Sequence, residues 1–66
     1  MAKNLQMKSA RVLQDMSQEE LARAVGVTRQ TISYIEKGEY NPTLNLCRKI
    51  CSVLNKNLEE LFGEKV

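Results

Sequence analysis

The chain has 66 residues, of which 42% are hydrophobic and 27% are charged, and its formal net charge is +2. These values fit one small globular domain, and no apolar run approaches the roughly 18 residues that a membrane span requires. Residues 1–8 lack the apolar core of a signal peptide, so we expect a single-domain cytoplasmic protein that does not enter a membrane.

The first predicted helix runs from about Asn4 to Gln14. Met7, Ala10 and Gln14 fall on one side of that helix at helical spacing, and Leu13 lies beside them. This apolar stripe is weaker than those of the helices that follow.

Residues 17–38 predict two short helices joined by a tight turn. Ser17 and Glu20 have the spacing of a capping box, which begins the first of these helices. Gly26 can end it by taking a left-handed conformation, and Thr28 then begins the second. The connection is too short for the two helices to pack antiparallel, so they must cross at a steep angle.

Two more helices are predicted in the C-terminal part of the chain. Thr43 is a suitable cap for a helix over about residues 44–54. Asn57 and Glu60 repeat the capping-box spacing and begin a short helix over about residues 58–62. No strand pattern appears in the body of the chain, although a short strand pairing between the two termini is a minor alternative. The expected core stripe of the longer helix is Leu46, Ile50, Val53 and Leu54.

The order of small and branched residues within residues 17–38 indicates how the crossing helices pack. Ala22, Gly26 and Ile32 have the spacing of a DNA-binding helix-turn-helix. With SQEELA, VTRQTIS, IEKG and YNPTL in this order, the chain resembles the lambda-repressor and Cro-like (XRE) helix-turn-helix regulators of bacteria and their phages, from about Lys8 to Phe62. The resemblance implies an all-α fold, a compact five-helix lambda-repressor-like DNA-binding domain that occupies residues 1–66.

The resemblance also implies which side chains contact DNA. The second helix of the motif would read bases with its outward face, which carries Arg29, Gln30, Ser33 and Tyr34. An arginine can bond guanine O6 and N7 together, and a glutamine can do the same for adenine N6 and N7. The alternative is an ordinary polar helix surface. The predicted partners of the DNA phosphates are Gln18, Thr28, Thr31, Lys37 and Asn41.

One structural ion pair is also implied by the resemblance. In the resembled family an arginine of the first helix pairs with the glutamate that ends the recognition helix, and Arg11 and Glu36 occupy those places. Arg11 could instead reach solvent or a phosphate. The chain departs from the family at Ala10, where a larger aliphatic side chain is usual, and at Asp15, where glycine is common.

The sequence offers little for catalysis or metal binding. It has no histidine, no visible nucleophile–base pair and no glycine-rich phosphate loop, so we expect neither an enzyme nor a cofactor. Cys47 and Cys51 lie four residues apart on one helix, and two ligands do not make a tetrahedral zinc site. We expect both to be buried small hydrophobes, with a redox-sensing role as the alternative.

The function predicted on this basis is a sequence-specific transcriptional regulator, specifically a repressor, that binds a near-palindromic double-stranded DNA operator as a homodimer. Residues 1–50 carry eight basic and five acidic side chains, whereas residues 51–66 carry two and three, so the helix-turn-helix part is the more positive. No small-molecule ligand is apparent. A protein-interaction or antitoxin-type module with the same fold is the alternative. The expected dimer interface consists of Asn55, Lys56, Leu58, Leu61 and Phe62, to which Val66 could add.

Overall fold

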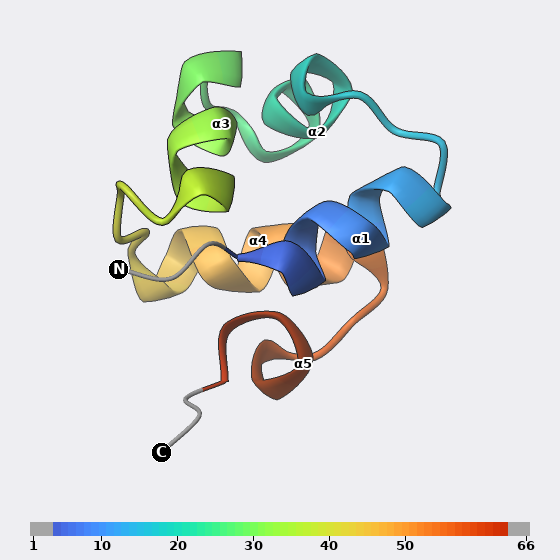
Figure 1. The fold of residues 1–66 in the computed structure, drawn as a ribbon, viewed down its shortest axis with the longest axis vertical. Helices are drawn as coiled ribbons and strands as arrows, with labels where there is room; N and C mark the ends of the chain where they lie inside the picture. The colour runs from blue at the N-terminus through green and yellow to red at the C-terminus, as the bar shows by residue number, and fades with distance from the viewer. Residues whose placement is uncertain (1–3, 64–66) are drawn as a thin grey trace.

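The computed structural model describes residues 4–63, and within that range it contains five α-helices and no strand. The helices are α1 (Leu5–Leu13), α2 (Gln18–Val25), α3 (Arg29–Lys37), α4 (Leu44–Leu54) and α5 (Leu58–Phe62). Figure 1 shows α2 and α3 above, α1 and α4 across the middle and α5 below. The predicted all-α, five-helix fold is confirmed. The possible strand between the termini, and Val66, fall outside the described residues.

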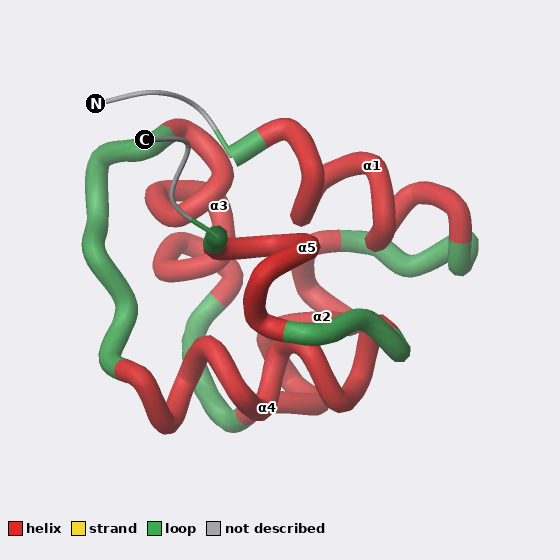
Figure 2. The backbone as a smooth tube through the Cα atoms, turned by 90° about the horizontal axis from the view of Figure 1, so that it is seen from below, coloured by secondary structure: helices red, strands yellow, loops and turns green. Residues whose placement is uncertain are grey.

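The helices lie on different sides of a shared apolar interior. Figure 2, seen from below, separates α1 from α4 and shows α5 in front of them, in agreement with its place below both helices in Figure 1. The same view shows residues 38–43 as a long loop that runs around the outside of the molecule from α3 to α4. This loop connects the end of α3 to the start of α4.

The helix starts follow from side chains that bond the first free backbone N–H groups. Ser17 Oγ accepts from the Glu20 N–H at 3.0 Å, and the Glu20 carboxylate accepts from the Ser17 N–H at 2.8 Å. Asn57 and Glu60 form the same reciprocal box at the start of α5. Asn4 also caps rather than joins its helix, so α1 is one residue shorter at each end than the sequence predicts.

Four helices are followed within two residues by a residue in the left-handed conformation, and only two of these four residues are glycines. Gly26 has φ 81° and Gly38 has φ 79°, as their use as helix terminators predicts. A Cβ at Gly26 would meet nothing within 4 Å, so this glycine is needed for its dihedral angle alone. Asp15 (φ 58°) and Asn55 (φ 60°) do the same for α1 and α4, because short polar side chains tolerate this conformation. Asp15 thus takes the left-handed conformation at the position where the resembled family commonly has glycine.

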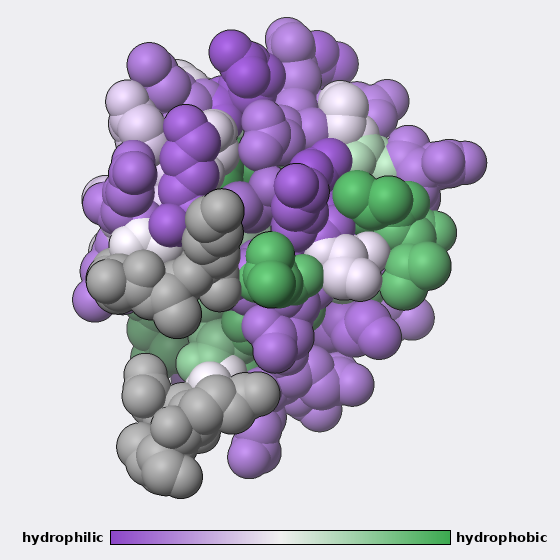
Figure 3. Space-filling view, viewed as in Figure 1, coloured by the Kyte–Doolittle hydropathy of each residue, from purple (hydrophilic) through white to green (hydrophobic). Residues whose placement is uncertain are grey.

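The core differs from the predicted stripes in α1 and α4. Leu13 is 80% exposed, which contradicts its predicted place beside the apolar face. At 100° per residue Leu13 points well away from the direction of Met7, whereas Gln14 points back and its amide donates to the Leu54 carbonyl at 2.8 Å. In α4, Leu46 and Val53 of the predicted core stripe are only half-buried, whereas Cys47 and Cys51 are buried. Figure 3 shows an apolar patch over the C-terminal end of α1 on a largely hydrophilic face. The fully buried large side chains are Met7, Leu21, Ile32, Ile50 and Leu54.

The predicted ion pair between α1 and α3 is present and buried. Arg11 Nε donates to Glu36 Oε2 at 2.8 Å, and Arg11 Nη2 donates to Glu36 Oε1 at 3.3 Å. The two side chains are only 10% and 5% exposed. Arg11 Nη1 also donates to the Met16 carbonyl at 2.7 Å, so the guanidinium binds the α1–α2 corner as well. A charge pair in this position needs such additional hydrogen bonds to offset its desolvation.

Glu36 also bonds to two further segments of the chain. Gln18 Nε2, from the first residue of α2, donates to Glu36 Oε1 at 3.0 Å. The backbone N–H of Asn4 donates to the Glu36 carbonyl at 3.0 Å. Contacts to Glu36 therefore fix α3 relative to both ends of α1 and to the start of α2.

We predict that Glu36→Ala lowers the free energy of unfolding by about 3–5 kcal/mol, because it leaves the Arg11 charge buried without its partner. Urea unfolding followed by circular dichroism measures this loss. Glu19→Ala is the control, since it breaks the pair between Arg23 and Glu19, whose side chains are 73% and 65% exposed. We expect that change to cost less than about 1 kcal/mol. Equal losses in the two variants would contradict the structural role of Glu36.

Candidate nucleic-acid interface

The turn between α2 and α3 brings the two helices into close contact. The Val27 N–H donates to the Ala22 carbonyl at 2.9 Å, which closes the C-terminal end of α2 around Gly26. Ala22 is 2% exposed and Ile32 is fully buried, so a small and a branched side chain fill the angle between the helices. This packing presents the opposite side of α3 to solvent.

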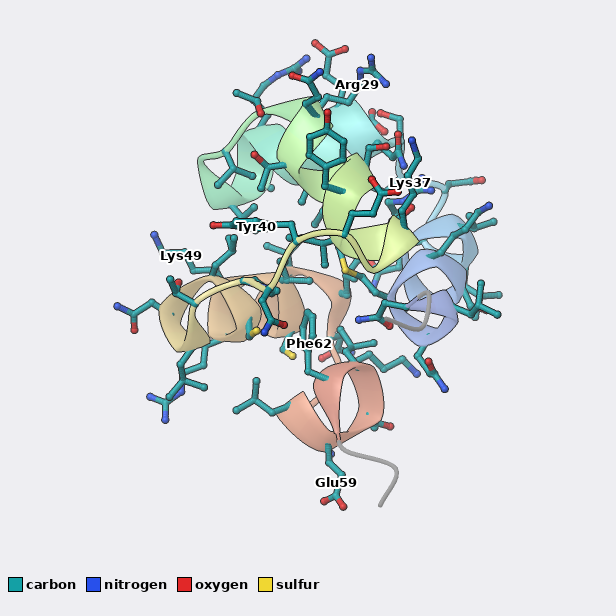
Figure 4. All side chains as sticks on the ribbon, turned by 60° about the vertical axis from the view of Figure 1, so that its left-hand side comes forward. Arg29, Lys37, Tyr40, Lys49, Glu59 and Phe62 are labelled. Atoms are coloured by element: carbon teal, nitrogen blue, oxygen red, sulfur yellow. The ribbon has the colours of Figure 1, made fainter. Side chains whose placement is uncertain are left out.

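The outward face of α3 carries the four predicted base-reading side chains. Arg29 and Gln30 are exposed, Tyr34 is 41% exposed and Ser33 is half-buried. Ile32 and Ile35 of the same helix point into the core, as predicted. Figure 4 places Arg29 at one end of α3 and Lys37 at the other, so the polar face extends along the whole helix. Three of the four side chains are thus exposed, and Ser33 is partly covered.

Tyr34 and Lys37 lie next to each other on this face. The Lys37 ammonium is 6.0 Å from the centroid of the Tyr34 ring, at the outer limit of a cation–π contact. The ammonium favours one position of the ring while both side chains stay accessible. An aromatic face next to a cation suits contact with a base edge and a neighbouring phosphate.

The predicted phosphate partners differ in how free their polar groups are. Asn41 and Lys37 are exposed. Thr28 and Thr31 bond to each other through their hydroxyl oxygens at 3.1 Å, and each hydroxyl keeps room for another partner. Gln18 is the exception, because its amide already donates to Glu36. A phosphate contact by Gln18 would have to use its second amide hydrogen or its backbone N–H at the start of α2.

The charge distribution on and near α3 favours an anionic partner. Glu36, the acidic residue within α3, is turned inward and paired with Arg11. Arg29 and Lys37 on the outward face make no ion pair within residues 4–63. The face is therefore cationic although the chain as a whole has a net charge of only +2.

Two exposed side chains near this surface, Tyr40 and Lys49, were not among the contact residues predicted from the sequence. Tyr40 is 43% exposed in the loop that follows α3, next to Asn41. Figure 4 shows Tyr40 between α3 and α4, on the same side of the molecule as Lys49 of α4. The sequence already showed Tyr40 in a loop beside the predicted recognition helix. It was a candidate contact residue, because exposed aromatic side chains are common at contact surfaces.

The predicted dimer-interface residues differ in how exposed they are. Asn55 and Lys56 are exposed in the turn between α4 and α5, and Leu58 and Phe62 are half-buried. Leu61 is only 4% exposed and belongs to the core of the single chain. A five-residue helix has one inward side, and Leu61 occupies it.

Comparisons with known proteins agree with this geometry. Residues 7–61 match the model of a family described as helix-turn-helix. An uncharacterized HTH-type transcriptional regulator of Archaeoglobus fulgidus is 50% identical over 56 residues, which cover 85% of this chain and 79% of that protein. The Bacillus subtilis regulator YgzD, of the same description, is 46% identical over 85% of both chains. The antitoxin PezA of Streptococcus pneumoniae is 34% identical over 88% of this chain but only 37% of PezA. The crystal structure of the restriction-modification controller protein C.AhdI from Aeromonas hydrophila is similar with a TM-score of 0.83, at 29% identity over 89% of both chains.

The two cysteines are buried, as predicted, and are not paired with each other. Cys47 is 8% and Cys51 is 4% exposed, and burial raises the pKa of both thiols above the ordinary value of 9.0. A redox sensor would need an accessible thiol with a lowered pKa, so these surroundings do not suit that alternative. Within residues 4–63 no three His, Cys, Asp or Glu side chains gather to hold a metal ion. None of the helices in that range is long and apolar enough to cross a membrane.

We predict that both thiols react far more slowly with iodoacetamide in the native protein than in urea, because the folded state limits access and disfavours the thiolate. Raised pKa values also mean that the folded state holds these protons more tightly than the unfolded state does. The thiols therefore contribute stability below the unfolded pKa, and this contribution is lost as pH rises through the folded pKa values. Wild type should lose more stability in this alkaline range than the Cys47→Ala, Cys51→Ala double variant. Rapid native alkylation would contradict the protected environment.

Proposed function

This chain belongs to the helix-turn-helix family of transcriptional regulators, and we propose that it binds a specific double-stranded DNA operator in the cytoplasm and represses transcription from it as a homodimer. The observation that carries the proposal is the outward face of α3, which is polar and cationic. The inner side of the same helix is fixed by core packing and by hydrogen bonds to Glu36. The buried pair of Arg11 and Glu36 supports this face without placing a negative charge on it. The role requires no catalytic group and no cofactor.

Sequence recognition would take place in the major groove, which is wide enough to admit α3. Arg29 and Gln30 lie in the first turn of α3 and have the side chains suited to guanine and adenine, respectively. Ser33 and Tyr34 lie about one turn further along and would contact neighbouring bases. Tyr34 could cover a thymine methyl group with its ring. These four side chains together would read about half of an operator.

Register on the DNA would come from contacts to phosphates. Lys37 and Asn41 flank the C-terminal end of α3, while Thr28 and Thr31 lie at its start. Gln18 would approach the backbone from the start of α2, held in place by its bond to Glu36. Contacts of this kind orient the protein but carry no sequence information.

A homodimer would place two copies of α3 in successive major grooves. Two-fold symmetry of the protein then requires a near-palindromic operator, with half-sites roughly one helical turn of DNA apart. Repression would follow from occupancy of DNA that the transcription machinery needs. The C-terminal part of the chain, with half-buried Leu58 and Phe62, is the expected contact between the copies.

The alternative is a protein-interaction or antitoxin-type module, and the similarity to PezA is the observation that favours it. It is the weaker proposal, because a protein-binding α3 face would be expected to be apolar. The outward side of α3 instead carries mainly hydrogen-bonding groups. Selection of bound sequences from a random duplex pool separates the two proposals, since a module that only binds proteins would enrich no motif.

We predict that Arg29→Ala and Gln30→Ala each weaken binding to the best operator by about 1–3 kcal/mol and relax the preference at one position per half-site. Each variant loses the paired hydrogen bonds to one base edge. Random-pool selection with each variant measures the effect. Selection profiles identical to that of wild type in both variants would refute base reading by these side chains.

We predict that Lys37→Ala weakens binding to all duplexes about equally and lowers the slope of log K against log salt concentration by about 1, because one fewer counterion is released. Titrations at several salt concentrations measure this. Lys37→Arg is the matched control, since it keeps the charge and should keep the slope. A change of sequence preference in Lys37→Ala would show that the side chain acts through Tyr34 and not through phosphate.

A further inference from the structure

Exposed polar groups lie on the side of α3 that faces away from α1. Figure 4 looks onto α3 with α1 to its right, and it places Tyr40 and Lys49 to its left. Tyr40 is 43% exposed in the loop between α3 and α4, and Lys49 is exposed on α4. Lys49 forms no ion pair within residues 4–63, so its ammonium is available to an anion.

The direction of Lys49 on α4 separates it from the neighbouring cation, Arg48. Consecutive residues of an α-helix point about 100° apart, so the two side chains leave α4 in different directions. Lys49 lies three residues after Leu46 and four before Val53, both of which pack against the core. Arg48 instead lies one turn after Leu44, which is 57% exposed. Because α4 contains no Asp or Glu, neither charge is neutralised within the helix, and the two cations form a matched pair for comparison.

The width of the DNA major groove implies that both sides of α3 meet the phosphate backbone. The groove is about 12 Å wide, and an α-helix with its side chains is about 10–12 Å across, so α3 alone would fill it. The molecule measures 31 × 22 × 20 Å along its principal axes, so it extends beyond the groove. The parts of the chain that flank α3 would therefore face the two phosphate backbones that border the groove.

The two flanks of α3 are formed by different elements. Gln18 donates to Glu36 Oε1 at 3.0 Å, and Glu36 pairs with Arg11 of α1, so Gln18 belongs to the α1 side of α3. The other flank consists of α4 and the loop before it, where Tyr40 and Lys49 lie (Figure 4). A cation and an aromatic hydroxyl thus stand on the side of α3 that Gln18 does not reach.

We propose that Tyr40 and Lys49 bind backbone phosphates on the side of α3 opposite Gln18. The inference rests on DNA binding in the proposed function, and it extends the contact proposed for Asn41 from the loop onto α4. The Lys49 ammonium supplies a positive charge, and the Tyr40 hydroxyl can donate a hydrogen bond to a phosphate oxygen. Glu39 precedes Tyr40 and carries the opposite charge, so the electrostatic attraction on this side depends on Lys49. Contacts to both backbones would fix the tilt of α3 in the groove.

The first test compares Lys49→Gln with Arg48→Gln on a duplex that carries one half-site, obtained by random-pool selection. Both changes remove one positive charge from an exposed position of α4, and glutamine keeps a good helix propensity. We expect Lys49→Gln to lower the slope of log K against log salt concentration by about 1 per subunit, because one fewer counterion is released. Arg48→Gln should leave the slope unchanged. Equal slopes in the two variants would overturn the proposed contact, which requires the two cations to differ.

The second test locates the contact on the DNA. Single phosphates of the half-site duplex are replaced in turn by neutral methylphosphonates, and binding of wild type, Lys49→Gln and Lys37→Ala is measured on each. We expect at least one phosphate whose neutralisation weakens wild-type binding about threefold to tenfold but leaves binding of Lys49→Gln unchanged. It should differ from the phosphate that couples to Lys37→Ala, since Figure 4 places Lys37 and Lys49 on opposite sides of α3. No phosphate coupled to Lys49, or the same phosphate for both lysines, would overturn the assignment.

Tyr40→Phe tests the hydroxyl without changing the charge or the ring. We expect binding to all duplexes to weaken about threefold while the salt slope and the base preference of wild type are retained, because a neutral donor releases no counterion. Urea unfolding of the same variant is the control, and its midpoint should match that of wild type. Wild-type affinity in Tyr40→Phe, or an altered base preference, would overturn the part of the assignment that concerns Tyr40.

Random-pool selection distinguishes failure of this contact from failure of the proposed function. With Lys49 bound to a phosphate, Lys49→Gln still enriches the wild-type motif but binds it more weakly. A wild-type protein that enriches a motif, together with a Lys49→Gln variant of equal affinity and slope, would overturn the contact and leave DNA recognition by α3 standing. A wild-type protein that enriches no motif would overturn the proposed function together with this contact.

Discussion

The buried carboxylate of Glu36 is the constraint on which the rest of the structure depends. Its two oxygens accept hydrogen bonds from Arg11 and Gln18, and its backbone carbonyl accepts one from Asn4. Apolar packing of Ile32 and Ile35 would allow α3 to slide or rotate, since hydrophobic contacts are not directional. Hydrogen bonds to one carboxylate fix both distance and angle, so the orientation of α3 is set by charged groups within a small apolar core.

The same arrangement determines the electrostatics of the outward face. A glutamate on the recognition helix would repel phosphates if its charge were exposed. Because Arg11 neutralises that charge on the inner side, the outer side retains Arg29 and Lys37 as net positive groups. One ion pair thus contributes to the position of α3 and to the sign of its field, and removal of either partner would disturb both.

The sequence predicted best the features that depend on residues close together in the chain or on a pattern shared by the family. Capping boxes at Ser17 and Asn57 involve residues three positions apart, so they could be found without knowledge of the fold. The place of Arg11 opposite Glu36 came from the resemblance, because no local rule links residues 25 positions apart. The error at Leu13 concerns which side of a short helix meets the core. With so few turns, a single apolar residue does not define a face, and tertiary packing decides the burial.

The two ends of α4 differ in how deeply their side chains are buried. Ile50, Cys51 and Leu54 are buried in the core near its C-terminal end, which Gln14 also ties to α1. At its N-terminal end, Leu44 is 57% exposed. The loop of residues 38–43 joins that end directly to α3. Gly38 ends α3 and Thr43 caps the start of α4, so a short connection with fixed ends sets how α4 lies relative to α3.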